Sequence, residues 1–95
     1  GIAVPPAPAP DAPTVTLFNA THVAWRGVAG AANYTIERGG SAQGPWSVLC
    51  QACVSDAELP YRYTATPGQS FLRVQGINPD GLAGAFSVPQ QQHYY

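Results

Sequence analysis

Two cysteines, Cys50 and Cys53, form a C-x-x-C pair and are the residues best suited to chemistry in this chain. Disulfide oxidoreductases place this spacing beside a βαβ unit and a helix N-terminus, and neither pattern surrounds it here. A zinc site needs two further ligands at close spacing, and the two histidines, His22 and His93, are isolated in different regions. We therefore predict a local disulfide, with two reduced, buried cysteines as the alternative. A disulfide implies an oxidising, extracellular compartment.

Two Asn-x-Thr triplets, at Asn19 and Asn33, match the acceptor sequence for N-linked glycans. Such triplets also arise often by chance. Asn19 falls in a predicted hairpin turn and Asn33 at a predicted strand start, so we expect both side chains to be accessible. Both are candidate glycosylation sites if the chain comes from a secreted eukaryotic protein, and neither would be used in a bacterium.

Carboxylates are few and scattered, and the five acids are Asp11, Glu37, Asp56, Glu58 and Asp80. Glycoside hydrolysis needs two carboxylates facing each other across a cleft, and the only near pair, Asp56 and Glu58, lies in a predicted loop. Glu37 is expected to point outward from a strand, beside an Arg of a neighbouring strand. No motif surrounds a serine or histidine as in a nucleophilic triad, and the absence of lysine excludes a P-loop. We predict that the chain is not an enzyme and holds no metal or cofactor.

Aromatic side chains are the remaining functional candidates, because sugar rings stack on exposed Trp and Tyr rings. Trp25 is expected in the core. Trp46 follows a Gly-Pro pair at a predicted strand start, where it packs on the sheet or stands exposed. Tyr61 and Tyr63 are two residues apart, so their side chains share a face of the chain. If that face points outward, the two rings form a binding platform. In the favoured arrangement it points inward, and the rings belong to the core. Trp46, Tyr61 and Tyr63 are therefore the candidate carbohydrate-stacking residues.

Size and charge narrow the class of protein further. The 95 residues make one domain at most. Four Arg against five acids give a formal net charge of −1, so we expect no contact with nucleic acid or an anionic membrane. No apolar run is long enough to span a bilayer. The 45% apolar fraction nevertheless predicts a folded core.

The two ends of the chain differ from its middle. Residues 1–12 are rich in Pro and Ala, a composition that favours extended polyproline II structure. We predict a semi-rigid linker from a preceding domain, with a proline-rich ligand for a partner domain as the alternative. Residues 90–95, which begin with a Gln run, are predicted to be a tail or the start of a connection to another segment.

From Thr14 onward the apolar residues alternate with a period of two, which predicts antiparallel strands. The predicted strands are 14–18, 21–25, 33–38, 46–48, 71–75 and 86–88. The first two form a hairpin, and residues 78–81, Asn-Pro-Asp-Gly, are a strong turn signal. Their spacing predicts an all-β domain, a sandwich of about seven antiparallel strands.

One segment fits two interpretations. The apolar residues of WSVLCQACVSDAEL, which starts at Trp46, also have the spacing of a short helix. We prefer a strand over 46–48 followed by an irregular or single-turn element that carries the cysteines, because strands are predicted on both sides.

Five segments, in order, resemble the fibronectin type III family. They are the Pro-rich entry at 10–14, Trp25, the Tyr-x-Ile-x-Arg strand within 29–38, Gly-Pro-Trp-Ser-Val at 44–48, and the run at 66–81. The resemblance covers residues 11–89 and implies an immunoglobulin-like β-sandwich over 13–89. Three features depart from the family: Ser70 stands where a corner tyrosine is usual, Gly76 replaces an Ala, and the cysteine pair is added. The first of these predicts a corner that is built differently from that of the family, or a bulge that shifts the register.

The segments at 44–46 and 54–56 also resemble modules appended to secreted glycoside hydrolases, especially fungal ones. This resemblance implies a non-catalytic accessory module of a secreted polysaccharide-degrading enzyme. Such a module would be a monomer that acts as a spacer or docking domain. The linker would join it to the catalytic domain of the same chain, and it would be able to bind carbohydrate weakly. The alternative function is an extracellular protein-protein interaction or adhesion module.

Overall fold

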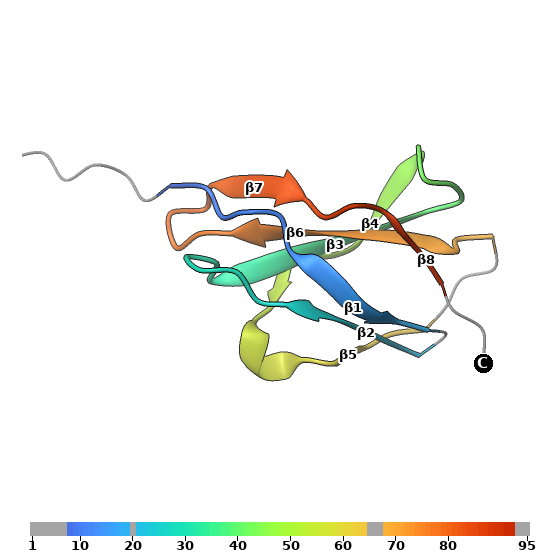
Figure 1. The fold of residues 1–95 in the computed structure, drawn as a ribbon, viewed down its shortest axis with the longest axis horizontal. Helices are drawn as coiled ribbons and strands as arrows, with labels where there is room; N and C mark the ends of the chain where they lie inside the picture. Colours follow the sequence, from blue (N-terminus) through green and yellow to red (C-terminus); the bar gives the residue numbers. More distant parts are fainter. Residues whose placement is uncertain (1–7, 20, 65–67, 93–95) are drawn as a thin grey trace, which may run out of the picture.

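The computed structural model describes residues 8–19, 21–64 and 68–92, and these residues form an all-β structure (Figure 1). Eight strands build two antiparallel sheets. The strands are β1 (Thr14–Phe18), β2 (His22–Arg26), β3 (Asn33–Gly39), β4 (Trp46–Val54), β5 (Tyr61–Arg62), β6 (Phe71–Ile77), β7 (Ala83–Phe86) and β8 (Gln90–Gln91). The first sheet has the order β1-β2-β5, and the second has the order β4-β3-β6-β7, with β8 also paired to β6. The predicted all-β class is confirmed.

Most predicted strands are present, with three differences. β5 and β8 were not predicted as strands, because each has only two residues and pairs with a strand distant in the sequence. The last predicted strand, 86–88, is displaced, since β7 ends at Phe86. The predicted turn at 78–81 is confirmed, because the Gly81 N–H donates to the Asn78 carbonyl at 2.9 Å and Gly81 has a φ of 87°.

The segment with two interpretations is a strand. β4 runs without interruption from Trp46 to Val54, so the helix alternative is wrong. The preferred strand at 46–48 is present, and it continues through both cysteines instead of ending before them, with an irregular register between Cys50 and Val54. A short 3-10 turn, η1 (Asp56–Glu58), follows β4.

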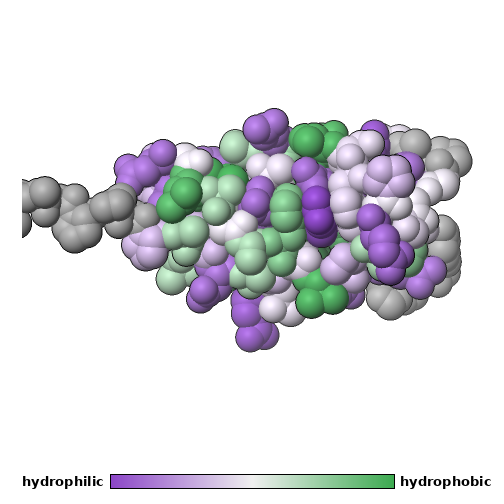
Figure 2. Space-filling model, turned by 90° about the horizontal axis from the view of Figure 1, so that it is seen from above, coloured by the Kyte–Doolittle hydropathy of each residue, from purple (hydrophilic) through white to green (hydrophobic). Residues whose placement is uncertain are grey.

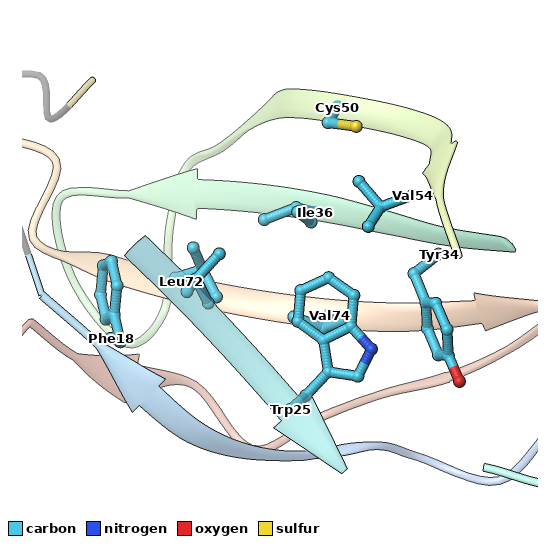
Figure 3. Close-up of a cluster of buried hydrophobic side chains, with 9 residues drawn as sticks. Phe18, Trp25, Tyr34, Ile36, Cys50, Val54, Leu72 and Val74 are labelled. Carbon is cyan, nitrogen blue, oxygen red and sulfur yellow. The ribbon is translucent and has the colours of Figure 1, made fainter. Parts of the chain in front are cut away.

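Nine buried apolar side chains fill the space between the sheets (Figure 3). They are Phe18, Val23, Trp25, Tyr34, Ile36, Cys50, Val54, Leu72 and Val74. The rings of Trp25 and Tyr34 meet across the two sheets with centroids 5.1 Å apart. Because side chains alternate along a strand, the same strands present a second, outward face.

β1 contains an irregularity that the alternation of its sequence does not indicate. Val15 lies opposite Trp25, but Leu17 lies opposite Ala24, so the register shifts between them. The shift adds a residue to β1 and brings Phe18 into the core, while Leu17 is only half-buried.

Tyr34 anchors the loop between β2 and β3. Its side chain is completely buried, and its hydroxyl accepts the Val28 N–H at 3.1 Å. Burial raises the pKa of Tyr34 above its ordinary value, the Val28 hydrogen bond opposes this rise, and the nearby Asp56 carboxylate adds to it. The folded protein therefore favours the neutral form of this hydroxyl.

The chain before β1 lies alongside β7, as the blue segment of Figure 1 shows. Pro10 and Pro13 are buried, and the Asn78 side-chain amide donates to the Pro8 carbonyl at 3.2 Å. A Cβ on Gly84 would overlap the carbonyl of Pro10, 2.8 Å from its carbon atom. Only glycine permits this close backbone approach. Residues 8–12 thus contact the domain, and the linker role of 1–12 stays a prediction, since 1–7 lie outside the described residues.

Gly84→Ala should lower the free energy of unfolding by about 1–3 kcal/mol, because the added methyl group overlaps the Pro10 backbone. Urea unfolding measures the change. In a chain that begins at Asp11, the same substitution should lower the free energy of unfolding much less, because the Pro10 backbone that the methyl group overlaps is absent. An equal cost in both chains would contradict the contact with Pro10.

Tyr34→Phe should change how stability depends on alkaline pH. In the unfolded chain tyrosine ionises near pH ~10, while the raised pKa of Tyr34 moves its ionisation to higher pH in the folded state. Tyr34 therefore contributes its full stabilisation below pH ~10, and this contribution is lost as pH rises toward its folded-state pKa. Unfolding measured from pH 8 to 11 should show a decline in stability that is shallower in the variant. Identical slopes would contradict the raised pKa.

Candidate interaction surface

The outward face of the second sheet carries a row of aromatic and charged side chains. Because Ile36 and Val74 point into the core, their neighbours Glu37 and Arg73 point outward, and these two residues lie directly opposite each other on β3 and β6. Trp46 on β4 and Phe86 on β7 lie on either side of them. We call Trp46, Glu37, Arg73 and Phe86 the outer row.

Arg73 is the centre of the outer row. Its Nε and Nη2 atoms donate to Oε1 of Glu37 at 2.9 and 2.6 Å, which confirms the predicted pair of Glu37 with an Arg. Its guanidinium carbon also lies 4.5 Å from the ring centroid of Trp46 and 3.9 Å from that of Phe86. The Arg73 side chain thus connects β6 to three other strands, to β3 by an ion pair and to β4 and β7 by cation–π contacts.

Gly39 lets Trp46 lie close to the sheet. The two residues are opposite each other, and a Cβ on Gly39 would come within 3.1 Å of the indole ring and 2.9 Å of the Pro45 carbonyl oxygen. Trp46 is half-buried, with Arg73 over its ring. The ring is therefore only partly available to a ligand.

The outer row suits apolar and stacking contacts more than acid–base chemistry. The Glu37 carboxylate and the Arg73 guanidinium neutralise each other. Val48, the next outward residue after Trp46 on β4, is 51% exposed. Figure 2 views the molecule from above in the orientation of Figure 1, and apolar and polar side chains intermingle on that face.

The structure does not bring the three candidate stacking residues together. Tyr61 and Tyr63 are half-buried against the core, in the inward arrangement. Tyr63 packs on Phe18 with ring centroids 6.1 Å apart, and its hydroxyl donates to the Asn19 carbonyl. Trp46 lies on the outward face of the other sheet. Any carbohydrate contact of Trp46 therefore involves its neighbours in the outer row instead of the two tyrosines.

Two features of the outer row were missed from the sequence. Phe86 was placed in a strand but not singled out, and Arg73 was not recognised as the residue that links Trp46 to Phe86. The outward alternation of Arg73 was a usable signal, but strands β4 and β7 are brought beside it only by the order of the sheet.

The two candidate glycosylation sites are both half-buried. The Asn19 side-chain oxygen accepts the backbone N–H of Thr21 at 3.0 Å and that of His22 at 2.8 Å, and it also accepts the Thr21 hydroxyl. These bonds shape the β1–β2 turn. Asn33 begins β3 opposite Ile77. Glycan attachment at either site stays a prediction.

The predicted disulfide between Cys50 and Cys53 is present, with their Cα atoms 5.8 Å apart. Among the described residues, no three or more His, Cys, Asp or Glu side chains gather as metal ligands would. No helix in that part of the chain is long and apolar enough to cross a membrane.

One small cavity lies between β1 and β8. It has a volume of about 40 Å³ and is lined by residues 15–18 with Gln90 and Gln91. Sites for small organic ligands are typically about 300 Å³ or larger. This cavity has room for water but not for a sugar ring.

Comparisons with protein-family models, with curated proteins and with solved structures gave no match.

Arg73→Lys should lower the free energy of unfolding by about 1 kcal/mol, because an ammonium group cannot lie flat between two rings or donate two hydrogen bonds from a rigid plane. Arg62→Lys on the exposed side of β5 is the matched control and should change stability by less than about 0.5 kcal/mol. Urea unfolding of both variants measures the difference. Equal effects would show that the contacts of Arg73 do not stabilise the sheet.

Proposed function

We propose that this chain is a non-catalytic, fibronectin type III-like accessory module of a secreted polysaccharide-degrading enzyme, acting as a spacer and docking domain. The division of its strands into a β1-β2-β5 sheet and a β4-β3-β6-β7 sheet around one core supports an immunoglobulin-like sandwich. The Cys50–Cys53 disulfide supports an extracellular location. Fold alone does not establish function, so the proposal depends on the contacts of the proline-rich segment and on the outer row.

The observation that carries the proposal is the way the proline-rich segment meets the domain. Its residues 8–13 are held along β7 by the hydrogen bond from Asn78 to Pro8 and by the fit of Pro10 against Gly84. A freely jointed connection would leave the orientation of the domain undetermined. A segment fixed in this way leaves the domain in a defined direction at residues 8–10, which supports a spacer role.

The outer row is the surface proposed for docking and for weak carbohydrate binding. Trp46 is half-buried and offers part of its side chain, Val48 adds exposed apolar area, and the Glu37–Arg73 pair offers groups that can exchange hydrogen bonds with hydroxyls. Because Arg73 already covers part of Trp46, a sugar ring gains less stacking area than on a free indole. Binding through this surface should therefore be weak.

A protein-binding role is the second candidate, and it is favoured by strand β4. This strand lies at the edge of its sheet, and residues 42–55 contain no charged side chain. Edge strands without charges can accept an extended strand from a partner. A partner bound there would contact Val48 but not Phe86, which distinguishes the two roles.

Retention of the chain on insoluble mannan, cellulose, xylan and chitin tests the carbohydrate part of the proposal. We expect weak retention on at least one of them at high protein concentration. Trp46→Ala should lower it about fivefold, since the loss of one partly covered aromatic contact costs about 1 kcal/mol. Val88→Ala, at a residue 74% exposed, is the control and should bind as the unmodified chain does.

Two outcomes would overturn this part. Absence of retention on all four polysaccharides would remove carbohydrate binding and leave the spacer and protein-docking roles. Undiminished retention of Trp46→Ala would show that the sugar binds outside the outer row.

A further inference from the structure

The two cysteines enclose an irregular stretch of β4. Ile36 on β3 lies opposite Cys50, whereas Tyr34, two residues earlier, lies opposite Val54. β4 therefore advances four residues while β3 advances two, and residues 51–53 form a bulge opposite Thr35. Both ends of the bulge, Cys50 and Val54, point into the core.

The bulge and the disulfide require each other. In a regular strand, residues three apart point to opposite faces and their Cα atoms are roughly 10 Å apart, which is too far for a disulfide. Here the Cα atoms of Cys50 and Cys53 are 5.8 Å apart. The sulfur–sulfur bond thus holds β4 in a shape that the strand would not otherwise adopt.

The backbone of the bulge is strained at Ala52. This residue has a φ of 48°, in the left-handed region that disfavours side chains other than glycine. Its N–H donates to the hydroxyl of buried Thr35 at 3.0 Å rather than to a strand carbonyl. Opening the disulfide would release this strain.

The two cysteines differ in exposure. Cys50 is 8% exposed and packs in the core, whereas Cys53 lies with Gln51 and Ala52 on the exposed side of an edge strand. An attacking thiolate can therefore approach Cys53 from solvent. Exposed and strained disulfides are the ones that exchange most readily with thiols.

We propose that the Cys50–Cys53 disulfide is a thiol-exchange site, at which a dithiol reductant opens the β4 bulge while the rest of the sandwich stays folded. One thiolate of the dithiol bonds to Sγ of Cys53, and the Sγ–Sγ bond breaks so that Cys50 leaves as a thiolate and takes a proton from water. The second thiolate of the dithiol then attacks the mixed disulfide and releases Cys53. Two electrons pass from the dithiol, which becomes a disulfide, to the protein.

The effect of opening should be local. The disulfide closes a loop with only two residues inside it, so it constrains the unfolded chain little and adds little to global stability. The core side chains on β2, β3 and β6 do not depend on it covalently. Amide hydrogen exchange should therefore accelerate at residues 51–54 after reduction and stay unchanged in β6.

The test uses the full chain in native buffer, with dithiothreitol as the probe and mass measurement after thiol alkylation. We expect no label without dithiothreitol and two labels after it, with no denaturant present. Ala52→Gly relieves the strain at the bulge. The midpoint, which is the ratio of reduced to oxidised dithiothreitol that reduces half of the protein, should therefore be about fivefold higher than in the unmodified chain. Ala85→Gly, at an exposed residue of β7, is the matched control and should leave the midpoint unchanged.

Three outcomes would overturn the proposal. Labelling that requires denaturant would show that the disulfide is closed to exchange in the folded protein. Equal midpoints for Ala52→Gly and Ala85→Gly would show that strain in the bulge does not drive opening. Loss of exchange protection in β6 of the reduced unmodified chain would show that the disulfide holds the whole domain together instead of the bulge alone.

Discussion

The pairing of β3 with β6 is the contact on which the rest of the structure depends. Seven consecutive residue pairs, from Asn33–Ile77 to Gly39–Phe71, join these two central strands in unbroken register. Their inward side chains, which include Tyr34, Ile36 and Val74, form the middle of the core. Because the period of a strand is two, the same register places Glu37 and Arg73 opposite each other on the outward face.

Shifting this register by one residue would exchange the two faces. Arg73 would be forced into the core, and Val74 would face water, so both the burial of apolar area and the ion pair would be lost together. The packing of the core therefore fixes where the outer row lies. Its position follows from where the apolar residues of β3 and β6 must lie, and the Arg73 side chain is long enough to reach Trp46 and Phe86 on the strands at each side.

Around this central pair, irregular features concentrate at the edge strands. β1 has a register shift near Leu17, β4 has the disulfide-bonded bulge, and β7 gives way to β8 after a break at residues 87–89. Bulges at edges interrupt the straight run of hydrogen-bonding groups that would invite pairing with another chain. A chain without lysine has fewer charges with which to protect its edges. The bulge protects residues 51–53 of β4 by geometry and leaves the regular stretch 46–48 as the part of this edge open to a partner strand.

Much of the fold could be predicted because alternation is a local property. Val23, Trp25, Tyr34 and Ile36 follow the two-residue period, and each is buried as that period indicates. The short strands β5 and β8 escaped prediction because their two residues pair only when the neighbouring strands are already in place. Phe18 escaped it because one extra residue in β1 reverses the alternation, and no local signal marks that residue.

The sequence by itself determined the all-β class, the turns at glycine and proline, the local disulfide and the outward position of Glu37, since each depends on residues close together in the chain. Tertiary structure alone decided that Arg73 lies between Trp46 and Phe86, that Tyr61 and Tyr63 face the core, and that Pro10 fits against Gly84. These contacts join residues up to 74 positions apart, and their geometry depends on strand order and on bulges. Both are set by how the whole chain packs its apolar side chains, which no local pattern records.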